Sequence, residues 1–91
     1  MRTIERSTLF KRDYKRESKA RTTLDDDLQP ALVALATDTP LDPRYRDHAL
    51  SGDWAGYRDC HIKPDLVLIY AKPDGATLRL ARLGSHSEVF G

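Results

Sequence analysis

The sequence predicts a small α+β domain whose elements follow the order strand, helix, helix and three strands. Two segments of the N-terminal half carry apolar residues at helical spacing. A proline-containing loop follows them, and beyond it the apolar residues are spaced as in strands, with a Pro-Asp-Gly turn between two of the runs. We therefore expect a small antiparallel sheet with two helices packed on one of its faces.

Size and composition limit the class of protein. The chain has 91 residues, of which 40% are hydrophobic and 32% charged, as in a soluble globular domain. This length allows one domain with one core, which we expect to span residues 1–91. Cys60 is the only cysteine, so no internal disulfide can form. The chain has no apolar run of about 18 residues and no apolar segment at its start, so we expect a cytoplasmic protein without membrane contact.

The first two elements are a short strand at residues 2–6 and a helix at residues 7–20. Ser7 or Thr8 can cap the start of this helix. Phe10 and Tyr14 are four residues apart and should share its apolar face. The other side of the helix is basic and carries Lys11, Arg12, Lys15, Arg16 and Lys19.

This basic side belongs to a segment with a large local charge. Residues 2–21 contain eight basic and three acidic side chains, a net charge of +5 in a chain whose overall charge is +1. One interpretation is an ordinary solvated helix surface. The other is a surface that binds a polyanion, and the charge pattern alone leaves both open.

The second helix is predicted over residues 24–37, where four leucines fall on one helical stripe. Pro30 is tolerated best in a first helical turn, where its missing N–H has no intrahelical partner. We therefore expect the regular helix to begin near Asp26 or Asp27 and to end before Pro40. The acidic residues would then lie at the positive end of the helix dipole.

The C-terminal half is predicted to be a loop followed by three strands. Residues 39–53 contain two prolines and a Ser-Gly pair, which are typical of a loop. The strands are expected at residues 54–62, 66–72 and 76–84, and Pro73 to Gly75 should form the turn before the last one.

Three histidines are the candidates for chemistry. His48 lies in the loop, His61 near the end of the first long strand and His86 just beyond the last one. Each taken singly can be structural, and no local metal-binding motif joins them. Histidines that converge would suit proton transfer near neutral pH. Because neighbouring strands run antiparallel, Arg82 and His86 should return to the edge where Asp65 follows His61.

A longer pattern supports a family resemblance. The stretch DHALSGDWAGYRDCHIKPDLVLIY, at residues 47–70, and LRLARLGSHSEVFG, at residues 78–91, resemble the YafQ branch of the RelE-type toxins. These are toxins of bacterial type II toxin–antitoxin pairs. The resemblance covers nearly the whole chain and implies a RelE-like fold. It also implies an endoribonuclease that cleaves mRNA in the ribosomal A site without a metal or other cofactor. The 2′-hydroxyl attacks the adjacent phosphate and leaves a 2′,3′-cyclic phosphate.

The resemblance also implies roles for individual residues. Its active positions fall on His48, His61, Asp65, Arg82, His86 and Phe90. His86 would be the leading proton donor, and His61 with Asp65 a base or base-orienting pair that His48 supports. Arg82 would neutralise phosphate charge and Phe90 would stack on a base. The basic helix residues would lie against ribosomal RNA, and a cognate antitoxin would cover the enzyme.

Some features keep other functions open. Leu66 stands where these toxins often have a tryptophan, which leaves base preference undetermined. Trp54 and Tyr57 are interpreted as packing residues. The alternative functions are a non-enzymatic relative that poisons a protein such as gyrase, and a structural metal site built from the histidines. We also expect an ordered C-terminal segment, such that removal of residues 89–91 abolishes cleavage at little cost in stability.

Overall fold

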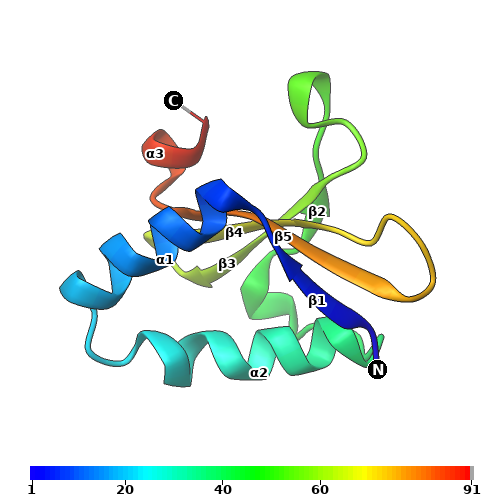
Figure 1. Ribbon diagram of the computed structural model, residues 1–91, viewed down its shortest axis with the longest axis horizontal. Coiled ribbons are helices and arrows are strands. Elements are labelled where there is room, and N and C mark those ends of the chain that lie inside the picture. The colour runs from blue at the N-terminus through cyan, green and yellow to red at the C-terminus, as the bar shows by residue number, and fades with distance from the viewer. Residues whose placement is uncertain (91) are drawn as a thin grey trace.

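The computed structural model describes residues 1–90 and forms a five-stranded sheet in the order β1-β5-β4-β3-β2 (Figure 1). Its strands are β1 (Thr3–Arg6), β2 (His48–Ala49), β3 (Arg58–Lys63), β4 (Leu66–Ala71) and β5 (Thr77–Gly84). Its helices are α1 (Thr8–Ala20), α2 (Leu24–Ala36) and α3 (His86–Phe90), with 3-10 turns at Pro43–Tyr45 and Gly52–Trp54. The predicted α+β class is confirmed. No helix within residues 1–90 is long and apolar enough to cross a membrane.

Strand β4 is the centre of the molecule, because all six of its residues are buried. Its alternating side chains contribute to two clusters. Leu66, Leu68 and Tyr70 pack with the apolar faces of α1 and α2. Val67 and Ile69 face the other side of the sheet, where α3 and the loop between β2 and β3 stand (Figure 1). The sheet therefore has a main core beneath it and a smaller apolar cluster above it.

Helix α1 begins as the sequence predicts. The Ser7 side chain caps it by accepting a hydrogen bond from the Phe10 backbone N–H at 2.9 Å. The same hydroxyl donates to the Ala81 carbonyl at 2.8 Å, so the cap also joins the helix to β5. Phe10 and Tyr14 stack with ring centroids 6.3 Å apart, which confirms their shared face.

Helix α2 begins earlier than expected, at Leu24. The expected start near residues 26 and 27 was wrong, because Pro30 lies inside the helix and not in its first turn. An interior proline costs about 3 kcal/mol. Burial of Leu24 and Leu28, each 3% exposed or less, contributes about 1.5 to 3 kcal/mol per side chain and offsets that cost. Pro30 itself is exposed, and without an N–H it donates no hydrogen bond to the Asp26 carbonyl.

The predicted loop and the first long strand also differ in their bounds. The loop contains the short strand β2, and β3 begins at Arg58, four residues later than residue 54, where the strand was expected. Gly52 and Gly56 have φ angles of 65° and 90°, which turn the chain sharply and prevent an extended strand there. The turn brings Trp54 and Tyr57 into an edge-to-face contact at 5.2 Å against the smaller cluster, so their interpretation as packing residues is confirmed.

The strand pairing decides which end of the sheet can hold a site. Strand β1 pairs in parallel with β5, and the remaining neighbours are antiparallel. The sheet is therefore mixed, and the expected antiparallel arrangement was wrong for β1. Val67 of β4 lies opposite both His61 of β3 and Gly84 of β5. The end of β5 therefore returns to the edge where β3 turns into β4, as the antiparallel arrangement predicts.

Candidate active site

A row of residues across four strands builds the floor of the site. His48 lies opposite Asp59, Asp59 opposite Ile69, and Ile69 opposite Arg82. Opposite residues in a sheet point to the same face, here the face that carries α3. The next row is His61, Val67 and Gly84, and His86 follows Gly84 by two residues. We call this surface, defined by His48, Asp59, His61, Arg82 and His86, the histidine face.

Asp59 is the residue of this face that the sequence analysis missed. Its side chain is 3% exposed, and its Oδ1 atom has no hydrogen-bond partner among the described residues. Burial raises the pKa of Asp59, and the nearby charges of His48, His61 and His86 oppose that rise. All three histidines thus lie close enough to act on one buried carboxylate. The Asp-x-His spacing within a strand is the signal that would have placed Asp59 beside His61.

The position of His48 fixes its tautomer. Its Nδ1 atom lies 2.9 Å from the Arg46 carbonyl oxygen and 3.0 Å from Asp59 Oδ1. A carbonyl and a carboxylate oxygen both accept, so Nδ1 carries a hydrogen and directs it at the Arg46 carbonyl. The side chain of His48 is 56% exposed.

Helix α3 carries His86 and Phe90 and is held by a capping box. Ser85 N–H donates to Glu88 Oε1 at 2.9 Å, and Glu88 N–H donates to Ser85 Oγ at 3.2 Å. His86 and Phe90 lie one turn apart with ring centroids at 4.7 Å. The described part of the C-terminal segment is therefore ordered, as expected, and Gly91 lies outside the described residues.

Val89 corrects the expectation about the last residues. Its side chain is 4% exposed and packs in the smaller cluster with Val67 and Ile69. Removal of residues 89–91 would therefore lose about 1.5 to 3 kcal/mol of burial, and the expected small cost in stability was wrong. Phe90 is only half-buried against that cluster and is the better position to change.

Arg82 is held by α1. Asp13, which is 3% exposed, accepts from Arg82 Nε at 2.7 Å and from Arg82 Nη2 at 3.3 Å. The Arg82 side chain is 19% exposed. Its place in the row with Asp59 puts a cation at the end of the histidine face nearest α1.

Asp65 does not pair with His61 as expected. It lies in the turn between β3 and β4, its side chain is 73% exposed, and its Oδ2 atom lies 3.1 Å from Arg21 Nη2. The hydrogen bond from Arg21 lowers the pKa of Asp65. The turn directs Asp65 toward the end of α1, whereas Asp59 shares a strand face with His61. The carboxylate beside the histidines is therefore Asp59.

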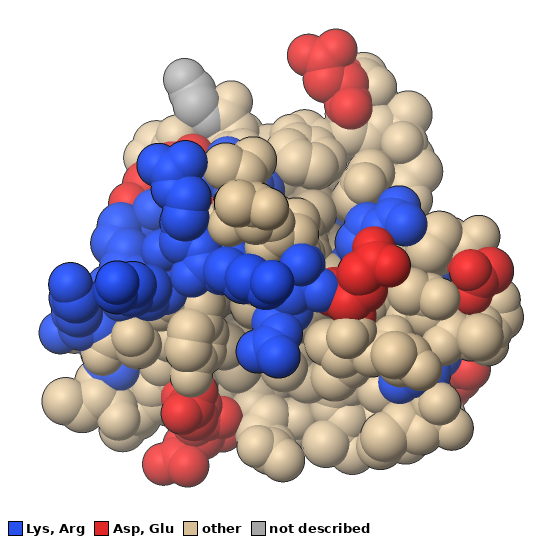
Figure 2. Space-filling view, in the orientation of Figure 1, with Lys and Arg blue, Asp and Glu red and all other residues tan. Residues whose placement is uncertain are grey.

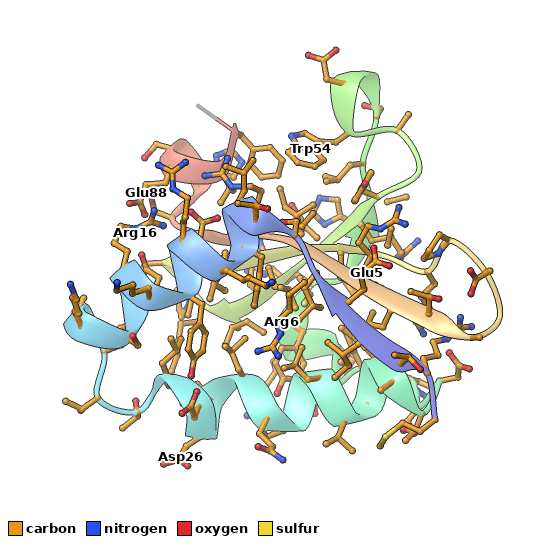
Figure 3. The ribbon with its side chains drawn as sticks, in the orientation of Figure 1. Glu5, Arg6, Arg16, Asp26, Trp54 and Glu88 are labelled. Carbon is orange, nitrogen blue, oxygen red and sulfur yellow. The ribbon has the colours of Figure 1, made fainter. Side chains whose placement is uncertain are left out.

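The basic side chains of α1 separate into two groups. Figure 2 shows lysines and arginines gathered over this helix. Arg16, whose side chain is 43% exposed, forms ion pairs with Asp13 at 3.0 Å, Glu17 at 3.1 Å and Glu88 at 3.3 Å. Figure 3 shows Arg16 and Glu88 side by side where α1 meets α3. The outward group, which we call the basic face, consists of Lys11, Arg12, Lys15 and Lys19.

The arrangement suits acid–base chemistry on a phosphate. The histidine face combines imidazoles, a buried carboxylate and a guanidinium within neighbouring rows. Within residues 1–90, no group of three His, Cys, Asp or Glu side chains is arranged to hold a metal ion. His61 also lines a groove of about 660 Å³, whose other charged lining residues are Arg44, Arg46, Lys63, Asp26 and Asp27.

Comparisons with known proteins agree with this geometry. Residues 2–91 match the family described as bacterial toxin of type II toxin–antitoxin system, YafQ. The mRNA interferase toxin YafQ of Escherichia coli K12 is 40% identical over 91 residues, which cover 99% of this chain and 97% of that protein. The crystal structure of the E. coli DinJ–YafQ complex superposes with a TM-score of 0.88 at 38% identity and covers 100% of both chains. A metal-bound toxin from Helicobacter pylori superposes with a TM-score of 0.90 at 46% identity, covering 99% of this chain and 100% of that one.

Proposed function

The chain belongs to the YafQ family of bacterial type II toxins, and on this basis we propose that it is an endoribonuclease that cleaves mRNA in the ribosomal A site. The observation that supports the activity is the histidine face, where His48 lies 3.0 Å from the buried Asp59 and His61 and His86 are near enough to influence its charge. Apolar side chains at these positions could neither donate nor accept a proton. A binding module that poisons a protein target does not require such a set.

The proposed reaction uses the substrate's own 2′-hydroxyl as the nucleophile. A base removes its proton, the 2′-oxygen bonds to the adjacent phosphorus, and the bond from phosphorus to the 5′-oxygen breaks. An acid protonates the leaving 5′-oxygen, which yields a 2′,3′-cyclic phosphate and a 5′-hydroxyl. We assign the acid to His86, because it lies exposed on α3, and the base to His61, which is two residues from Asp59 on the same strand face.

The other site residues assist these steps. We assign Asp59 the orienting role that was expected of Asp65, in which it stabilises an imidazolium at His61. His48 Nδ1 lies 3.0 Å from Asp59 Oδ1. Arg82 binds the phosphate as its negative charge concentrates. Phe90, one helical turn from His86, positions a nucleobase by stacking. The role of Asp65 stays a prediction; its side chain is 73% exposed and pairs with Arg21.

The protein partner we propose is a cognate antitoxin. E. coli YafQ forms a complex with DinJ, and this chain superposes on YafQ along its whole length. An acidic or amphipathic segment would complement the basic face and the cations near the histidine face. Such a segment would block access of RNA to both surfaces.

The direct test is cleavage of mRNA on programmed ribosomes. We expect cuts in the A-site codon, 5′-hydroxyl ends downstream and 2′,3′-cyclic phosphate ends upstream, as measured by primer extension and mass spectrometry. Free mRNA should be cut far more slowly. Ends that carry a 5′-phosphate would contradict the mechanism. Growth arrest without any cut would favour the alternative, a protein target such as gyrase, which a supercoiling assay would identify.

The basic face should supply much of the affinity for the ribosome. Replacement of Lys11, Lys15 and Lys19 by glutamine should weaken binding to the ribosome. The fall of log K with log salt concentration should also become less steep, by about 0.7 to 0.9 in slope per lost phosphate contact. Filter binding to 70S ribosomes at several salt concentrations measures that slope. Lys72→Gln is the matched control, because Lys72 lies after β4 and pairs with Asp38. Equal slopes for the triple variant and the parent would show that the basic face does not bind the ribosome and is an ordinary solvated surface.

A further inference from the structure

We infer that Asp13 is a positioning residue of the active site, which holds the guanidinium of Arg82 so that its free end faces the substrate phosphate. This inference rests on the proposed function, because it assigns Arg82 a phosphate to bind. Asp13 lies on α1 and Arg82 on β5, 69 positions apart in the chain. The contact is therefore made only by the tertiary structure.

Asp13 is a buried carboxylate with four donors around it. Its Oδ2 atom accepts from Arg82 Nε at 2.7 Å and from the Leu83 backbone N–H at 3.0 Å. Its Oδ1 atom accepts from Arg16 Nη1 at 3.0 Å and from Arg82 Nη2 at 3.3 Å. Burial alone would raise the pKa of Asp13, but the bonds from Arg82, Leu83 and Arg16 together lower it. The carboxylate is thus ionised at neutral pH and fully engaged.

The geometry of the guanidinium shows what this bond leaves free. Asp13 occupies the side of Arg82 that carries Nε and Nη2. The end formed by Nη1 and Nη2 is the other edge at which a guanidinium forms a pair of parallel hydrogen bonds, and phosphate oxygens match that edge. Arg82 Nη2 also lies 3.5 Å from the Glu88 carbonyl oxygen, whereas none of the hydrogen bonds within residues 1–90 involves Nη1. Asp13 therefore orients the cation and leaves Nη1 as the donor for a phosphate. An arginine without such an anchor would lose more rotamer entropy on binding the phosphate.

The same network fastens the helix that carries His86. Arg16 bonds Asp13, donates to the Leu83 carbonyl at 3.0 Å and pairs with Glu88 of α3 at 3.3 Å. Gly84 leaves room for this approach, since a Cβ atom there would lie 2.8 Å from Arg16 Nη2. Asp13 thus stands at the junction of α1, β5 and α3, next to the proposed phosphate site.

Glu17 provides the matched comparison. It is the other buried carboxylate of α1, at 6% exposure, and it also accepts from Arg16. Its second partner is Arg21 at 2.9 Å, and none of its hydrogen bonds within residues 1–90 involves Arg82. Asp13→Asn and Glu17→Gln therefore both remove one buried charge from the same helix, but only the first changes the environment of Arg82.

The experiment compares the two variants in structure and in rate. In the parent, the Arg82 Nε–H should give a slowly exchanging NMR resonance, because a buried carboxylate accepts from it. We expect this resonance to be lost in Asp13→Asn and kept in Glu17→Gln. Single-turnover cleavage on ribosomes should fall about 10- to 100-fold in Asp13→Asn at unchanged KM, and clearly less in Glu17→Gln. Thermal unfolding of both variants accounts for lost stability.

A double-mutant cycle decides whether Asp13 acts through Arg82. If it does, adding Asp13→Asn to Arg82→Ala should cost nothing further in rate. Additive losses, or normal cleavage by a folded Asp13→Asn, would refute the positioning role. The proposed function fails differently, since His86→Gln and Arg82→Ala would then both cleave at the parent rate. In that case the positioning role falls with it.

Discussion

His86→Gln should abolish mRNA cleavage while leaving the protein folded. Glutamine can form hydrogen bonds but cannot deliver a proton to the leaving 5′-oxygen. Loss of a general acid lowers a rate by about 100- to 10,000-fold. His86 is exposed on α3, and its ring contact is with Phe90, so stability should change by less than about 0.5 kcal/mol. Single-turnover cleavage on programmed ribosomes and thermal unfolding measure the two effects.

The control for this variant is Ser87→Ala. Ser87 follows His86 on the same short helix and is also exposed. The Ser87→Ala variant should cleave at the parent rate. Loss of cleavage in His86→Gln would then result from loss of the imidazole and not from disturbance of α3. If His86→Gln still cleaves mRNA and arrests growth at the parent level, His86 is not the acid. Growth arrest without cleavage in both proteins would instead point to a protein target.

Asp59→Asn should make the protein more stable at neutral pH and a poorer enzyme. Burial raises the pKa of Asp59 against the opposing charges of His48, His61 and His86. Between the ordinary pKa of an aspartate, about 4, and this raised value, the native state binds more protons than the unfolded state. The free energy of unfolding therefore falls as the pH rises through that window. Asparagine removes the buried charge, so the free energy of unfolding of Asp59→Asn at pH 7 should exceed that of the parent by on the order of 1 kcal/mol.

Catalysis should change in the opposite direction. Without the carboxylate, an imidazolium formed at His61 loses its nearest buried countercharge, and we expect at least a 10-fold lower single-turnover rate. Thermal unfolding between pH 4 and pH 8 tests the stability effect. Asp53→Asn, at an exposed acid in the turn before β3, should change neither property. An Asp59→Asn protein that is less stable than the parent at pH 7, or that cleaves normally, would contradict this account of the buried charge.

Local patterns predicted most of the secondary structure, because they report interactions between near neighbours. The spacing of Phe10 and Tyr14, the cap at Ser7 and the Pro-Asp-Gly turn each act within about one turn of chain. The capping box of Ser85 and Glu88 was also readable in the sequence, and it specifies α3, which the strand-based prediction omitted. Errors occurred where packing outweighed local preference, as with Pro30 inside α2.

The site was predicted in part for the same reason. Antiparallel order correctly returned the end of β5 to the turn after His61. Proximity in sequence, however, suggested Asp65 as the carboxylate partner of His61, and the structure places Asp65 against Arg21. Asp59 is the buried carboxylate near the histidines, because strand alternation puts it on the same face as His61 and strand pairing puts it opposite His48.

The amino-acid sequence by itself determined the α+β class, the approximate elements and the set of histidines, since composition and periodicity act over short distances. Only the tertiary structure decided which acidic and basic groups meet. Asp13 reaches Arg82 across 69 residues, and Arg16 leaves the basic face to join that contact. The free energy of these pairs depends on burial and distance, and neither quantity exists until the strands have paired and α1 has packed against β5.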